Sequence, residues 1–184
     1  MKAIWTAAIA SLALLSCAPP APQAATAPTD AAADCNKTAY STIAFTAPDA
    51  QDVVETRSIG KDCANAVVMI TIRKATGEPL WAWATTYGWL GNGAADQPGA
   101  MDAFLKSWKP KVDTTAALPD WPDREIFKDS LGAFMQTPFD RDQYLEIRAK
   151  ALPRLCHATG IESGLCIYYD PSTGVAAKVF ESGA

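Results

Sequence analysis

The only histidine in this 184-residue sequence is His157, so any Ser-His-Asp or Cys-His mechanism would have to use it as the base. The nearest serine, Ser163, lies in Gly160-Ile161-Glu162-Ser163-Gly164, one place out of register for a G-x-S-x-G nucleophile elbow. The neighbouring Cys156 is no nucleophile if it is held in a disulfide. We therefore predict a structural or surface histidine and no catalytic triad.

Acidic side chains gather in two stretches and provide the other candidate chemistry. A glycosidase needs two carboxyl groups roughly 5 to 9.5 Å apart, and a sequence does not fix that separation. No D-x-[DN]-x-[DN]-G loop predicts calcium. The candidates are Asp120, Asp123, Glu125 and Asp129 in the first stretch, and Asp140, Asp142 and Glu146 in the second.

Motifs for metals, nucleotides and nucleic acids are missing. One histidine cannot form a His-rich metal centre, and no cysteine pair has CxxC spacing. Gly91-Asn92-Gly93-Ala94-Ala95-Asp96, between Gly88 and Gly99, fits neither the phosphate-binding loop nor the dinucleotide fingerprint. A net charge of −4 argues against nucleic acid, which attracts clustered Lys and Arg. We expect no cofactor, no metal and no catalytic residue.

A row of aromatic residues is the best candidate for ligand binding. In a strand, alternate side chains share a face, so the aromatic side chains would lie opposite Leu80, Ala82 and Ala84. If the aromatic face points inward, it is core, and we favour this interpretation. If the Leu/Ala face packs instead, the aromatic face is an exposed platform for sugar rings or a partner protein. The residues of this row are Trp81, Trp83, Tyr87 and Trp89.

Strand patterns occur in two parts of the sequence, one before residue 88 and one after residue 164. Alternation or β-branched composition predicts strands at 41–45, 53–59, 66–73 and 80–87, the last two joined as a hairpin. A second hairpin is predicted from 165–169 and 175–181, around the turn 170–174.

Three helices are predicted between these strands. Apolar spacing indicates one helix over Met101, Phe104, Leu105 and Trp108, and another over Phe127, Leu131, Phe134 and Met135. The third has Asp140 as N-cap, Gln143 in the reciprocal capping position, a Phe139–Tyr144 staple and Pro153 beyond its end. The expected fold is α+β: an antiparallel sheet, about three inserted helices, and a C-terminal hairpin that could join the first sheet.

The N-terminus has the pattern of an export signal over residues 1–16. Lys2 precedes a 13-residue apolar stretch that is too short to span a bilayer. Leu14-Leu15-Ser16-Cys17 resembles the lipobox of bacterial lipoproteins, which implies that Cys17 is lipidated; the alternative is a plain secretory signal. In that class, a residue other than aspartate after the cysteine, here Ala18, favours the outer membrane. Residues 18–34, rich in Ala and Pro, predict an extended tether.

Four cysteines remain after Cys17, an even number that predicts disulfides in an exported protein. Three pairings are open. We favour Cys35–Cys63 and Cys156–Cys166 because each pair is local, and each bridge would contribute roughly 3 to 3.5 kcal/mol.

These patterns together predict a signal peptide (1–16), a lipidated Cys17 with a tether (17–34) and one disulfide-bonded α+β domain (35–184). The expected location is the periplasmic face of the outer membrane, with the bilayer as one partner and an envelope protein or glycan as another. The expected function is a non-catalytic binding or accessory module of the cell envelope. The alternatives are a hydrolase of envelope polymer that uses a carboxylate pair or His157, and an inhibitor of a lysozyme-like enzyme.

Overall fold

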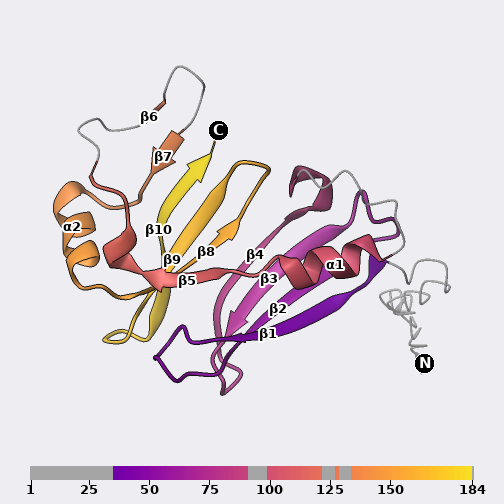
Figure 1. Ribbon diagram of the computed structural model, residues 1–184, viewed down its shortest axis with the longest axis horizontal. Helices are drawn as coiled ribbons and strands as arrows, with labels where there is room; N and C mark the ends of the chain where they lie inside the picture. The colour runs from indigo at the N-terminus through magenta and orange to yellow at the C-terminus, as the bar shows by residue number, and fades with distance from the viewer. Residues whose placement is uncertain (1–34, 91–98, 122–126, 129–133, 184) are drawn as a thin grey trace, which may run out of the picture.

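Two antiparallel sheets form the framework of the protein, seen in a computed structural model that describes residues 35–90, 99–121, 127–128 and 134–183 (Figure 1). The first sheet has the strand order β1-β2-β3-β4, and the second has the order β5-β8-β9-β10-β7-β6. The first comprises β1 (Thr38–Ile43), β2 (Asp52–Ile59), β3 (Val67–Arg73) and β4 (Pro79–Thr86). The second comprises β5 (Lys111–Thr114), β6 (Phe127–Lys128), β7 (Phe134–Gln136), β8 (Pro153–Ala158), β9 (Gly164–Asp170) and β10 (Val175–Gly183).

The main core lies between the two sheets. Alternation along β3 buries Val68, Ile70 and Ile72, while the residues between them face outward. These three side chains belong to one buried cluster with Leu155 of β8 and Ile167 of β9. Burial of these side chains holds the two sheets together through the hydrophobic effect. The hairpin predicted over 66–87 is confirmed, because β3 pairs with β4 in antiparallel orientation.

Two α-helices of the described chain pack against the sheets. Helix α1 (Ala100–Ser107) inserts Met101 and Leu105 into the main core and contacts β1 and β2. Helix α2 (Arg141–Ala149) packs through Tyr144 and Ile147 into a second cluster, which includes Val179 of β10. In Figure 1, α2 and the first sheet lie on opposite sides of the second sheet. The α+β class is confirmed, and no helix in the described part of the chain is long and apolar enough to cross a membrane.

The structure corrects two predictions about the second half of the chain. The helix predicted over Phe127 to Met135 is wrong at both described ends, which are the strands β6 and β7. Apolar spacing at Phe134 and Met135 did not decide the conformation, because these residues gain hydrogen-bonded partners in β10. The C-terminal hairpin, formed by β9 and β10, joins the second sheet and not the first.

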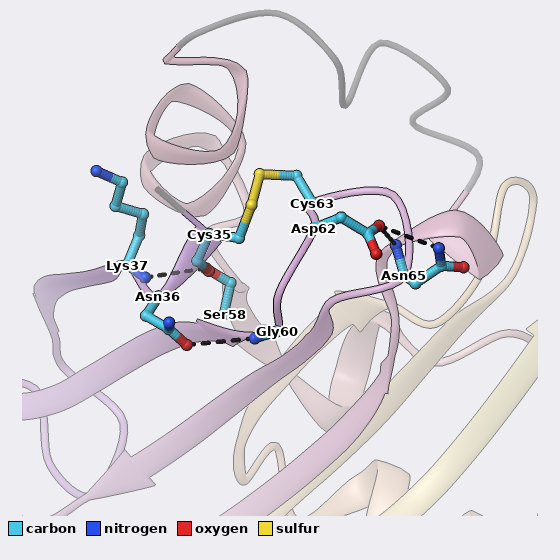
Figure 2. Close-up of a disulfide and its surroundings, with 8 residues drawn as sticks. All are labelled: Cys35, Asn36, Lys37, Ser58, Gly60, Asp62, Cys63 and Asn65. Atoms are coloured by element: carbon cyan, nitrogen blue, oxygen red, sulfur yellow. Dashed lines mark hydrogen bonds between the residues drawn. A yellow bond between two sulfur atoms is a disulfide. The ribbon is translucent and has the colours of Figure 1, made fainter. Parts of the chain in front are cut away.

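Two disulfides close the framework with the predicted pairing. Cys156–Cys166 joins residues directly opposite each other on β8 and β9. Cys35–Cys63 ties the start of β1 to the loop between β2 and β3 (Figure 2). Around it, Ser58 Oγ accepts from the Lys37 N–H at 3.1 Å. The start of β1 is therefore fixed by covalent and polar contacts. The predicted signal peptide, Cys17 and the tether lie outside the described residues.

Candidate functional site

The aromatic row of β4 turns toward the core. Trp81 and Trp83 are half-buried and pack against the main cluster, and Tyr87 is 2% exposed. Ala82 and Ala84 occupy the exposed face of the strand. The interpretation of Trp81, Trp83 and Tyr87 as an exposed platform is therefore wrong, and the favoured core interpretation is confirmed for them.

His157 is enclosed by the same aromatic side chains. Its side chain is 4% exposed, and the Trp83 ring centroid lies 5.2 Å from that of the imidazole. The Trp81 Nε1–H donates to His157 Nε2 over 3.4 Å, and Nδ1 lies 3.1 Å from the carbonyl oxygen of Ala158. Burial lowers the pKa of His157 below its ordinary value. Because both ring nitrogens contact other groups, His157 is not placed as a general base.

Ser163 does not form a nucleophile with this histidine. Its hydroxyl accepts a hydrogen bond from the Thr159 hydroxyl at 3.2 Å, in the turn between β8 and β9. The imidazole contacts given above point instead to Trp81 and to the Ala158 carbonyl. The prediction of a structural histidine therefore agrees with the geometry.

The described carboxylates have structural partners or lie in solvent. Asp120 pairs with Arg148 at 2.6 Å, and Glu146 pairs with Lys150 at 2.8 Å. Asp140 caps α2, and Asp142 is almost fully exposed. Among the described residues, no three His, Cys, Asp or Glu side chains come together as metal ligands. Asp123, Glu125, Asp129, Gly91 and Gly93 lie outside the described residues.

Trp89 is the most exposed member of the aromatic row, with 67% of its surface exposed. It belongs to the 3-10 turn η2 (Tyr87–Leu90), whose first and last residues are buried. With three residues per turn, Tyr87 and Leu90 share the inward face, so the residues between them point outward. The Tyr87 N–H also donates to the Ala66 carbonyl at 2.9 Å. The indole is thus held outward on an anchored turn.

Two open concavities meet at Trp89, and we call them together the Trp89 cleft. One has a volume of about 490 Å³ and lies between η2 and the β8–β9 turn. The other has a volume of about 480 Å³ and lies against the ends of β3 and β4. The first is lined by Gly88, Trp89, Gly160, Ile161, Glu162 and Ser163, and the second by Val67, Ala84, Thr85, Thr86 and Trp89.

Gly160 allows the indole to approach the β8–β9 turn. A Cβ at this position would lie 3.4 Å from Trp89 Nε1 and would collide with the Ser163 hydroxyl. Because Gly160 has no side chain, the indole and the β8–β9 turn can lie close together at this side of the cleft. Sequence reasoning singled out this segment only as a displaced nucleophile motif. Its actual role, a close approach to Trp89, depends on a contact between residues 71 positions apart, which no local pattern encodes.

The cleft combines an apolar surface with a few polar groups. Ile161 is 77% exposed and Val67 is 40% exposed, so both extend the apolar surface of the indole. Hydroxyl groups come from Thr85, Thr86 and Ser163. Glu162 is the only charged residue among the described residues that line either concavity. An indole face next to hydroxyls and a carboxylate suits a ligand with both C–H surface and hydroxyl groups.

Comparisons with known proteins add no relative: no family model matches the chain, and neither the curated proteins nor the solved structures yield a match.

Proposed function

We propose that this protein is a lipid-anchored, non-catalytic binding module of the cell envelope whose Trp89 cleft binds a glycan. The observation that carries the proposal is the exposed indole of Trp89 at the junction of the two concavities. An exposed aromatic of this size, held by buried neighbours, is the usual anchor of a binding surface. The lipobox and tether would present this surface at a distance from the outer membrane.

The charge of the cleft narrows the class of glycan. Glu162 would repel phosphate or carboxylate groups, while it can accept hydrogen bonds from hydroxyl, amide or amino groups. A neutral or amino-substituted sugar, such as the N-acetylhexosamines of envelope polymer, fits this surface best. A two-carboxylate hydrolysis is not supported here, because the described lining residues include one carboxylate and no second.

The proposal is tested by titrating the purified protein with oligomers of N-acetylglucosamine and by sedimenting it with isolated peptidoglycan. We expect Trp89→Ala to weaken binding by roughly tenfold or more, as truncation of an aromatic anchor that a ligand covers does. Tyr40→Ala is the matched control, because Tyr40 is 69% exposed and lies on β1, three strands away from β4. Equal binding by Trp89→Ala and the parent protein would refute the glycan site.

A further inference from the structure

Strand β1 is the edge of the first sheet opposite β4, whose end lines the Trp89 cleft. It pairs with β2 and with no other strand of the described chain. The Lys37 carbonyl accepts from the Ser58 N–H at 2.9 Å, so the backbone groups of Lys37 face β2. Because hydrogen bonding alternates along an antiparallel pair, the N–H and C=O groups of Thr38, Tyr40 and Thr42 face the opposite way. Within the described part of the chain, these three residues therefore present unpaired backbone groups along one edge.

This edge is held in place before any ligand arrives. The Cys35–Cys63 disulfide fixes the residue at its entrance, and Ser58 donates to the Cys35 carbonyl (Figure 2). The Gly60 N–H donates to Asn36 Oδ1 at 3.2 Å, one residue further along. A strand whose entrance is fixed in this way loses little conformational entropy when a second strand pairs with it.

A groove runs beside the edge, on the face of the sheet covered by α1. Its volume is about 190 Å³, and residues of β1 form one wall while the C-terminal end of α1 forms the other. The Thr56 hydroxyl donates to the Leu105 carbonyl at 2.9 Å and fixes the helix end above the sheet. The lining residues are Ala39, Tyr40, Ser41, Thr56, Leu105, Lys106, Trp108 and Lys109.

The groove is basic in a protein of net charge −4. Lys106 and Lys109 are exposed on its α1 side, and Lys37 lies just before β1. Among the described residues, none of these three lysines has a carboxylate within 4.0 Å, whereas Lys74, Lys150 and Lys178 do. The groove therefore offers unneutralised positive charge next to unpaired backbone groups.

We infer that the β1 edge binds an extended, acidic peptide segment of a partner protein by strand addition. Backbone groups that repeat every second residue, roughly 6.8 Å apart, are complementary to another extended chain. Alternate side chains of the added strand point into the groove, where acidic groups meet Lys106 and Lys109. The side chains between them lie beside the exposed ring of Tyr40, where an apolar residue is favoured. A second copy of the protein fits less well, because pairing two β1 edges would bring the lysines of both copies close together along the shared edge.

The test uses the full chain and two capped seven-residue peptides, one alternating Thr with Glu and the other alternating Thr with Lys. We expect the acidic peptide to bind saturably and to slow amide hydrogen exchange at Thr38, Tyr40 and Thr42. Tyr40→Pro removes an outward N–H without touching the bonds to β2, so it should weaken binding roughly tenfold or more. Tyr40→Ala is the control that keeps the N–H and loses the ring.

A double variant, Lys106→Glu with Lys109→Glu, leaves β1 unchanged and tests the charge even if Tyr40→Pro does not fold. It should lose the acidic peptide and keep its wild-type circular dichroism. The inference is overturned if both peptides bind equally, or if the acidic peptide binds the double variant as well as the parent. Two other results would also overturn the inference. In the first, hydrogen exchange at the amides of Thr38, Tyr40 and Thr42 slows only when the protein self-associates at high concentration. In the second, it slows only when vesicles of anionic lipid are added.

Discussion

Trp81 on the first sheet and His157 on the second meet in a hydrogen bond, with the indole Nε1 3.4 Å from the imidazole Nε2. Because the indole nitrogen can only donate, Nε2 must be the acceptor and the ring proton must sit on Nδ1. From there, it faces the Ala158 carbonyl, which also accepts from Trp108 Nε1 at 3.3 Å. The neutral imidazole therefore connects β4, α1's C-terminal end and β8 in one polar network inside the core.

This network predicts a loss of stability in mild acid. The pKa of His157 is lowered from 6.5 by burial, so the unfolded chain takes up the proton more readily than the folded protein. The neutral His157 contributes fully to the free energy of unfolding above about pH 7.5. This contribution decreases as the pH falls through 6.5, where the unfolded chain becomes protonated, and it stops decreasing below the pKa of His157 in the folded protein. Urea unfolding between pH 7.5 and pH 4.5 measures the change.

The control is His157→Gln, which cannot titrate. We expect this variant to be less stable at neutral pH, because it disturbs the contacts with Trp81 and the Ala158 carbonyl. Its stability should also vary less with pH than that of the parent protein across the same range. Parallel curves for the two proteins would show that His157 does not titrate with folding.

A second prediction concerns tryptophan fluorescence. Trp89 is 67% exposed, while Trp108 is 6% exposed and Trp81 and Trp83 are half-buried in the core. Trp89→Phe should therefore shift the emission to the blue and give a larger drop in acrylamide quenching than replacement of any other tryptophan in the described residues. Trp121→Phe, at a half-buried position in the second cluster, is the matched control and should change quenching less. Equal quenching of Trp89→Phe and the parent would place the indole in a protected environment.

The aromatic row shows why the sequence predicted the strand and named Trp89 as a candidate, but did not predict the cleft around it. Alternation along β4 correctly placed Trp81 and Trp83 on one face, since that follows from backbone geometry alone. Which face packs depends on partners far along the chain, such as His157, 76 residues away. Trp89 was grouped with the row, but the change from strand to 3-10 turn at Tyr87 points it outward.

Sheet partners were the other feature that the sequence did not determine. Strands β5 and β8 were not predicted, although β8 carries both His157 and Cys156. Both segments are short, and each lies at a proline, since β5 follows Pro110 and β8 begins at Pro153. Their pairing with each other joins residues about forty positions apart. The membership of β9 and β10 in the second sheet follows from that long-range pairing. Helix α2, by contrast, was predicted in detail because its signals are all local.

The capping box of α2 allows a quantitative check of such a local signal. The Asp140 carboxylate accepts from the Gln143 N–H at 2.9 Å, and Gln143 Oε1 accepts from the Asp140 N–H at 3.3 Å. Asp140→Ala leaves the Gln143 N–H without its partner, so the free energy of unfolding should fall by about 1 kcal/mol. Asp142→Ala is the matched control. It removes the same charge from the same helix end, where Asp142 makes no cap bond, and should cost about 0.3 to 0.5 kcal/mol.

Urea unfolding of both variants in low and high salt separates the two contributions. The effect of Asp142 is electrostatic and should shrink as salt screens the helix dipole, with a Debye length of about 3 Å at 1 M salt. The cap bonds of Asp140 are short and local, so most of their contribution should persist in high salt. If Asp140→Ala lost no more stability than Asp142→Ala in high salt, the helix start would depend on charge and on the packing of Tyr144, and not on the capping box.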